Sequence, residues 1–156
     1  TMLCYIPPEG GRAVVAAEDL AFPNGTVITP DGKTLILGES MGRRLTAFTI
    51  AAPGLLTERR VFAELPEDRL PDGICLDTAG GVWAASPTGN ECLRLEAGGQ
   101  VTHRVKVSQG AYACMLGGPG EQTLYVLTAA DSDPTAPAGT GCIEAAPAPY
   151  PRAGLP

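Results

Sequence analysis

The sequence has little of what several common functional classes require. It carries one histidine, one tryptophan and three phenylalanines among 156 residues, and 17 acidic residues outnumber 11 Lys and Arg. A net charge of −6 offers no basic stripe for a phosphate backbone, so we expect no nucleic-acid partner. No apolar run reaches the roughly 18 residues that suggest a membrane-spanning helix, so we expect no membrane span.

The five cysteines are odd in number, widely scattered and never spaced as Cys-x-x-Cys. A zinc site or a disulfide framework needs tighter spacing, so we interpret them as small apolar fillers in a reducing compartment. The first residues contain no basic and then apolar leader. We therefore expect a cytoplasmic protein. Because Thr1 leads directly into the strand-like run Leu3–Ile6, we also expect the natural start to lie upstream.

The sequence is rich in glycine and proline, with twenty and fifteen residues, which favours short strands and tight turns over long helices. A pattern of short apolar strands and glycine-rich turns recurs roughly every 45 residues, which is typical of a β-propeller blade. The three copies, aligned on Leu35, Val82 and Leu124, are Phe22–Ile50, Leu70–Leu95 and Ala111–Ala129. The sequence thus predicts an all-β fold, a partial β-propeller.

The repeats divide the chain into about three blades, whereas propellers usually close with four to eight. The expected divisions are two outer strands of a preceding blade in 1–20, a blade in 22–63, a blade in 70–107, an incomplete last blade in 111–146 and a Pro-rich tail in 147–156. An open arc leaves blade faces uncovered, which favours a homo-oligomer. One form of this alternative is a ring completed by two chains.

The first two repeats open with related motifs, Pro23-Asn24-Gly25 and Pro71-Asp72-Gly73. Loops of an antiparallel blade alternate between two faces, so Asn24 and Asp72 should enter innermost strands on the same face. Asp31 lies in a hairpin and should lie on the opposite face. Converging amide and carboxylate oxygens suit calcium or magnesium. The alternative is that both motifs are only turns, since Asn and Asp tolerate left-handed backbone.

Three further polar residues, Glu39, Ser40 and Arg43, follow the second strand of the first repeat. On the expected face they would either line a substrate pocket or form an exposed polar loop. The single histidine, His103, falls in an outer strand, and we interpret it as a strand residue at or near the surface.

The run FPNGTVITPDGKTLILGES, followed by PDGICLDTAGGVWAAS and LGGPGEQTLYVLTA, resembles the C-terminal half of the gluconolactonase family that includes regucalcin, or senescence marker protein. The resemblance covers nearly the whole chain. It implies a six-bladed propeller that holds one divalent metal on its axis and hydrolyses sugar lactones or related esters. It also implies that Asn24 and Asp72 are metal ligands. Calcium is the favoured ion, with zinc, manganese and magnesium as alternatives.

The implied mechanism is metal-assisted attack of water on a small-molecule lactone, with Asp72 also accepting a proton from that water. The family's third ligand is a glutamate from an early strand, and residues 1–22 contain no match for it. We therefore expect this chain to carry half of the site and to be inactive or incomplete alone. The alternative is a non-catalytic propeller segment that serves as a binding or assembly module, because fold does not fix function.

Overall fold

The computed structural model describes residues 1–133, 135 and 139–154. The regular structure in this part consists of β-strands and two short 3-10 turns, so it contains no helix long enough to cross a membrane. The elements are β1 (Leu3–Tyr5), β2 (Val14–Ala17), β3 (Pro23–Ile28), β4 (Thr34–Glu39), β5 (Arg44–Ala52), β6 (Leu55–Glu64), β7 (Ile74–Asp77), β8 (Val82–Ser86), η1 (Pro87–Gly89), β9 (Glu91–Leu95), β10 (Val101–Lys106), β11 (Gly110–Gly117), η2 (Pro119–Glu121), β12 (Thr123–Ala129), β13 (Cys142–Pro147) and β14 (Arg152–Ala153). The all-β class predicted from the sequence is confirmed.

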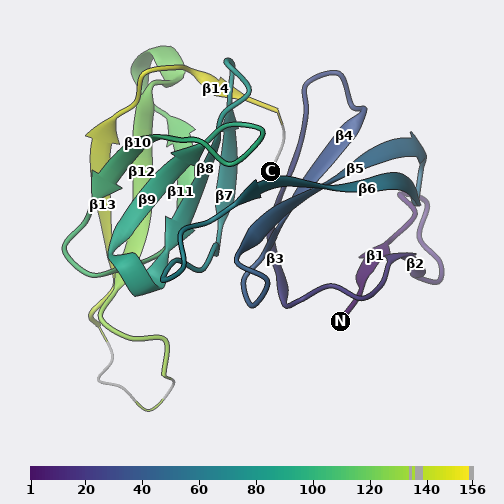
Figure 1. Cartoon of the computed structure of the whole chain (residues 1–156), viewed down its shortest axis with the longest axis horizontal. Coiled ribbons are helices and arrows are strands. Elements are labelled where there is room, and N and C mark those ends of the chain that lie inside the picture. Colours follow the sequence, from purple (N-terminus) through teal and green to yellow (C-terminus); the bar gives the residue numbers. More distant parts are fainter. Residues whose placement is uncertain (134, 136–138, 155–156) are drawn as a thin grey trace.

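The strands form four antiparallel sheets that follow one another along the long axis of the molecule (Figure 1). The strand orders are β1-β2, β3-β4-β5-β6, β10-β9-β8-β7-β14 and β11-β12-β13. Almost every strand pairs with its neighbour in sequence, which is the arrangement that short glycine-rich turns favour. The assignment of these sheets to numbered propeller blades stays a prediction.

The turn between β3 and β4 shows how local sequence sets this pairing. The Asp31 carboxylate accepts hydrogen bonds from the Thr29 hydroxyl at 2.6 Å and from the Lys33 backbone N–H at 3.0 Å. Gly32 follows with a φ of 69°, a left-handed conformation that costs glycine little. The turn is therefore held by hydrogen bonds among its own residues.

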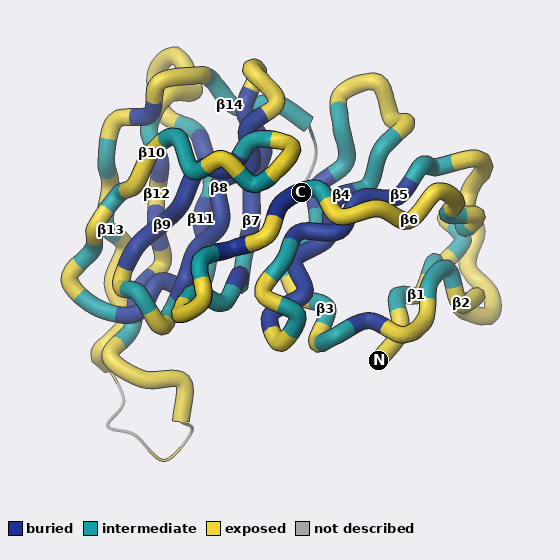
Figure 2. Tube along the Cα trace, viewed as in Figure 1, coloured by how far each residue is buried: buried dark blue, intermediate teal, exposed yellow. Residues whose placement is uncertain are grey.

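Strands β7, β8 and β9 of the central sheet are buried on both faces, whereas its edge strand β10 is partly exposed (Figure 2). Alternate residues of its strands point to opposite sides, as strand geometry requires. Ile74, Val82 and Leu93 pack against the β3–β6 sheet, whereas Trp83 and Cys92 pack against the β11–β13 sheet. The continuous apolar runs in β7–β9 are explained by this central place.

Apolar side chains remain exposed at the two ends of the row of sheets. One end is the β1-β2 sheet, where Val14 and Val15 are exposed, and the other is the β12–β13 surface, where Leu127 and Ile143 are exposed. Figure 2 shows the contrast between these ends and the buried strands at the centre. Neither end is covered by another part of the described chain.

The segment expected only as a Pro-rich tail contains a strand. β14 extends the central sheet beside β7, with Arg152 opposite Asp77 and Ala153 opposite Leu76. Further along, a Cβ added at Gly154 would lie 2.4 Å from the Ile28 carbonyl oxygen. The chain thus returns from the β11–β13 sheet to the ends of β7 and β3.

All five cysteines are free thiols, but only three behave as apolar fillers. Cys75, Cys92 and Cys114 are buried in the core between the second and third large sheets. Cys4 and Cys142 are exposed, so the apolar interpretation is wrong for these two. Both lie on the sheets that end the row, where no further sheet covers them.

Candidate functional site

The first strands of the three large sheets, β3, β7 and β11, begin side by side. Backbone hydrogen bonds connect them in order, from Gly25 N–H to Asp72 O at 3.2 Å and from Gly73 N–H to Tyr112 O at 2.9 Å. The two motifs singled out in the sequence therefore lie at the same end of adjacent strands. This juxtaposition is the basis of the candidate site.

Glycine is required in both motifs because the strands approach so closely. A Cβ at Gly25 would lie 2.6 Å from the Ile74 nitrogen and 2.7 Å from the Asp72 oxygen. A Cβ at Gly73 would lie 2.8 Å from the Cα of Ala113. Any side chain at either position would force the strand ends apart. The glycines thus set the short spacing at which the preceding Asn24 and Asp72 can meet.

The structure brings the side chains of Asn24 and Asp72 together. Burial raises the pKa of the half-buried Asp72 carboxyl above its ordinary value, and hydrogen bonds from the Asn24 side chain and the Gly73 backbone offset part of this effect. Asn24 is more exposed and lies at an irregularity in the pairing of β3 with β4. The pair presents one amide and one carboxylate group to the same region.

Asp72 differs from the fully buried carboxylates in lacking a positive partner. Glu39 pairs with Arg44 at 2.9 Å, and in the central sheet Asp77 pairs with Arg94 and Glu91 with Arg69, both at 2.6 Å. Among the residues that the structure describes, no Lys, Arg or His forms an ion pair with Asp72. A partly desolvated carboxylate without a counter-ion is a group that a bound cation would stabilise.

A complete metal site is not assembled from acidic, Cys and His side chains in the described part of the chain. No group of three or more such residues there lies close enough to hold an ion. Asn24 and Asp72 supply oxygen atoms, the donor type that calcium and magnesium prefer. The two side chains therefore offer donor atoms of the type that a hard divalent cation prefers. This pair alone does not complete a coordination sphere.

Asp31 occupies a different environment, although its Pro-Asp-Gly setting matches that of Asp72. Its carboxylate is exposed and is held by Thr29 and Lys33 in the β3–β4 turn, and these hydrogen bonds lower its pKa. This turn lies at the far end of β3 from Asn24. The two aspartates thus have opposite pKa shifts for a reason that local sequence does not reveal.

Of the three smaller candidates, Glu39 is not available to a substrate. Its side chain is fully buried, where it accepts hydrogen bonds from Arg44, the Thr46 hydroxyl and the Ala21 backbone N–H. Arg43 bonds through its guanidinium to the Glu67 carbonyl at 2.6 Å. Of the three, only Ser40 contacts the site, because its Oγ lies 3.4 Å from Asn24 Nδ2. The pocket-lining interpretation is therefore wrong for Glu39.

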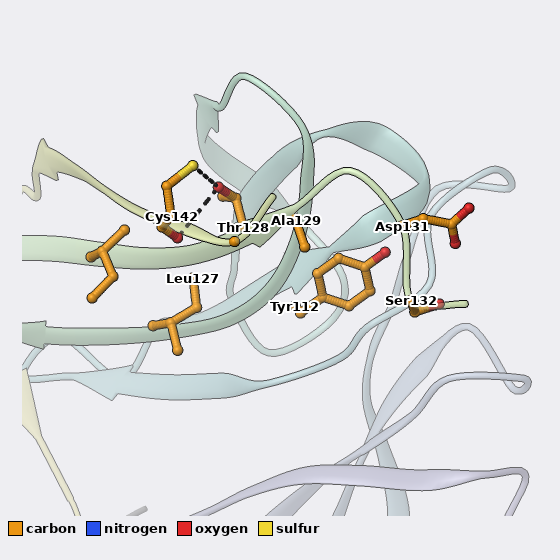
Figure 3. A pocket seen from close by; sticks show the side chains of 9 residues that line it. Tyr112, Leu127, Thr128, Ala129, Asp131, Ser132 and Cys142 are labelled. Carbon is orange, nitrogen blue, oxygen red and sulfur yellow. Dashed lines mark hydrogen bonds between the residues drawn. The ribbon is translucent and has the colours of Figure 1, made fainter. Parts of the chain in front are cut away.

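A third position equivalent to Asn24 and Asp72 is occupied by Tyr112. In the second repeat Cys75 pairs with Trp83, and in the third Met115 occupies the same position, opposite Tyr125. Asp72 lies three residues before Cys75 and Tyr112 lies three residues before Met115, so the two positions correspond. The third repeat lacks a Pro-Asn/Asp-Gly motif, and only its alignment on Leu124 could have identified this residue. Tyr112 lines a cavity of about 440 Å³ together with residues of β12 and β13 and with Asp131, which follows β12 (Figure 3). Neither Asn24 nor Asp72 lines that cavity.

The fold and this site define a class of protein. It is an all-β protein whose antiparallel sheets follow one another along the chain, with oxygen-bearing side chains where the first strands of adjacent sheets begin. A family model described as SMP-30/Gluconolactonase/LRE-like region matches residues 2–130. The chain belongs to this family, and the resemblance found in the sequence is confirmed.

Named relatives agree with this membership. The pentonolactonase XacC of Haloferax volcanii is 30% identical over 133 residues, which are 83% of this chain and 46% of that protein. Regucalcin of Xenopus laevis is 31% identical over 126 residues, which are 77% of this chain and 42% of that protein. The chain thus spans under half the length of these relatives.

Solved structures support the fold. A gluconolactonase from Xanthomonas campestris superposes with a TM-score of 0.68 at 32% identity, over 80% of this chain and 40% of that one. A calcium-binding regucalcin from Agrobacterium tumefaciens superposes with a TM-score of 0.78 at 22% identity, over 98% of this chain and 54% of that one. The second likeness shows the shared fold alone.

Proposed function

We propose that the protein containing this chain hydrolyses a sugar lactone or a related ester with one divalent cation, and that this chain carries the C-terminal half of the site. The observation that carries the proposal is the half-buried Asp72 carboxylate, which meets Asn24 and has no cationic partner among the described residues. Family membership supports the substrate class, since named members are lactonases.

Asn24 and Asp72 would hold the cation through their side-chain oxygen atoms. Calcium is favoured because it accepts amide and carboxylate oxygens together, and zinc, manganese and magnesium are alternatives. Calcium takes six to eight oxygen ligands, so water, substrate or residues outside this chain would supply the remainder. A glutamate from an early part of the protein is the ligand that the family resemblance implies.

Each residue would have a distinct role in lactone hydrolysis. A bound divalent cation supplies polarisation of the substrate carbonyl and stabilisation of the negative charge that develops on its oxygen. Asp72 would also accept a proton from the attacking water, because a carboxylate beside the cation lies within reach of that water. Asn24 is uncharged and would position the cation without exchanging protons.

The test is hydrolysis of sugar lactones by the protein that includes the upstream half, with calcium, zinc, manganese or magnesium added after removal of bound metal by a chelator. Asp72→Ala should abolish turnover, whereas Asp31→Ala should leave it unchanged because Asp31 lies in the exposed β3–β4 turn. Turnover that survives Asp72→Ala, or that depends on none of these cations, would overturn the proposal.

A second candidate function is a non-catalytic binding or assembly module. The exposed apolar side chains at both ends of the row of sheets favour it, because such surfaces commonly mark association sites. A homo-oligomer formed through these ends stays a prediction, as does a cytoplasmic location.

A further inference from the structure

Ser40 connects the two motifs of the candidate site. It follows β4 directly and is 6% exposed. Its hydroxyl donates a hydrogen bond of 2.6 Å to the Pro71 carbonyl oxygen, and its Oγ lies 3.4 Å from Asn24 Nδ2. One side chain therefore contacts the residue before Asp72 on one side and the amide of Asn24 on the other.

The proton count at Ser40 determines how Asn24 is oriented. A serine hydroxyl has one proton, and a carbonyl oxygen can only accept, so the short bond to Pro71 uses that proton. The Oγ atom can then offer only lone pairs to Asn24. Asn24 must turn its NH₂ group toward Ser40, and its amide oxygen Oδ1 consequently lies on the opposite branch, away from Ser40.

The remaining hydrogen-bonding capacity of Asn24 agrees with this orientation. Among the described residues, Ser40 is a hydrogen-bond partner of the Asn24 side chain, and it receives the NH₂ group. No donor in that part of the chain bonds to Oδ1, so Oδ1 keeps its lone pairs for a ligand.

We infer that Ser40 is a positioning residue that fixes the Asn24 amide so that Oδ1 is presented to a divalent cation. This inference rests on the proposed function for its ligand, although the orientation of Asn24 stands on the Ser40 geometry alone. Ser40 is specific to the first repeat. Glu39 is paired with Arg44 in the first repeat, and Ser86 is paired with Glu91 at the same place in the second. The residue of the second repeat that corresponds to Ser40 is therefore Pro87, which has no hydroxyl.

The first experiment is NMR of side-chain amides in the 156-residue chain without metal. The chain has two asparagines, so Asn24 can be read against Asn90, which is exposed and serves as an internal reference. In the unchanged protein, Asn24 Nδ2 protons should show nuclear Overhauser contacts to the Ser40 Hβ protons. Their absence would overturn the inference without any variant being made.

The Ser40→Ala variant removes both hydrogen bonds. Hydrogen exchange of the Asn24 side-chain amide should become about fivefold faster, the effect of losing one typical hydrogen bond, with Asn90 unchanged. Ser40→Thr keeps the hydroxyl and should restore the slow exchange. Thr88→Ala is the matched control, because the Thr88 hydroxyl also donates to a loop carbonyl, that of Asp68 at 2.8 Å, without contacting Asn24. Unchanged Asn24 exchange in Ser40→Ala would overturn the inference.

The second experiment is calorimetric titration with calcium chloride of the same variants, made in the protein that includes the upstream half. Ser40→Ala should weaken binding by about tenfold, the size expected for an outer-shell residue that orients a ligand, while Ser40→Thr and Thr88→Ala bind as the unchanged protein. Equal affinity in Ser40→Ala would contradict the inference. If the unchanged protein binds no divalent cation, the metal part of the proposed function fails, and the NMR result still decides whether Ser40 orients Asn24.

Discussion

Asp31 and Asp72 stand in the same tripeptide, Pro-Asp-Gly, and have opposite electrostatic surroundings. Hydrogen bonds lower the pKa of the exposed Asp31, whereas burial raises the pKa of Asp72. Alternation of loops between two faces distinguished the two in the sequence, and the structure places them at different ends of their strands. The chemistry of a short motif in this fold is therefore set by which end of a strand it occupies.

Glu39 illustrates the opposite case, a residue whose role the sequence did not reveal. Its polar neighbours in the chain suggested an exposed loop, but the side chain is buried beside Arg44. Burial alone would raise the pKa of Glu39. The hydrogen bonds from Arg44, Ala21 and Thr46 outweigh that effect and lower the pKa from 4.5 to about 2. Such a pair depends on distant strands and has no local signal.

The Glu39 pKa predicts how stability depends on pH. A carboxyl with a lowered folded-state pKa stabilises the fold above its unfolded pKa, and this contribution is lost as pH falls from about 4.5 toward about 2. The full contribution is on the order of 3 kcal/mol. Urea unfolding at several pH values should show this loss in the unchanged chain and a smaller one in Glu39→Gln. Glu9→Gln, in an exposed turn, should keep the original slope; an equal slope in Glu39→Gln would refute the prediction.

At the scale of elements, strands with alternating apolar residues and glycine turns were predictable. The regions of β3–β10 were expected from these signals, which arise from residues close together in the chain. β14 was missed because a two-residue strand among prolines has no periodicity, and its partner β7 is distant in sequence. It is held by long-range contacts, including Thr78 N–H to Pro151 O at 2.9 Å and the Arg94 guanidinium 4.7 Å from the Tyr150 ring.

Gly154 provides a test of β14. Its φ is 70° and a Cβ there would lie 2.4 Å from the Ile28 oxygen, so Gly154→Ala should detach the end of the chain from β3 and β7. Gly10→Ala is the control, since Gly10 also has a positive φ, of 84°, with no atom within 4 Å of its Cβ. The control measures the cost of placing alanine in a left-handed backbone conformation, about 1–2 kcal/mol, without any steric clash.

Thermal unfolding and hydrogen exchange of the Thr78 amide provide the readout. We expect Gly154→Ala to lower the free energy of unfolding more than Gly10→Ala and to speed Thr78 exchange, because that amide donates to Pro151. Equal stability losses together with unchanged Thr78 exchange would show that β14 contributes nothing to the fold.

At the scale of the whole molecule, the repeat predicted both the class of fold and the end of the sheets where Asn24 and Asp72 meet. Apolar side chains are exposed at both ends of the row, Leu127 and Ile143 on one and Val14 and Val15 on the other. The open arc expected from the repeat, and a partner that covers its ends, stay predictions. The chain spans 46% of the Haloferax pentonolactonase. The remaining ligands of the site could not be predicted here, because two oxygen-bearing side chains fix a location and a donor type without a full coordination sphere.

The central claim is that Asp72, with Asn24, contributes to a cation site, and calorimetric titration with calcium chloride of the protein that includes the upstream half tests it most directly. Saturable binding of one ion is predicted. Asp72→Asn removes the charge at nearly constant shape and should weaken binding by more than about a hundredfold, beyond what outer-shell substitutions usually cost. Asp31→Asn, in the other Pro-Asp-Gly tripeptide, should bind as the unchanged protein does. Equal affinity in Asp72→Asn, or no binding by the unchanged protein, would contradict the claim.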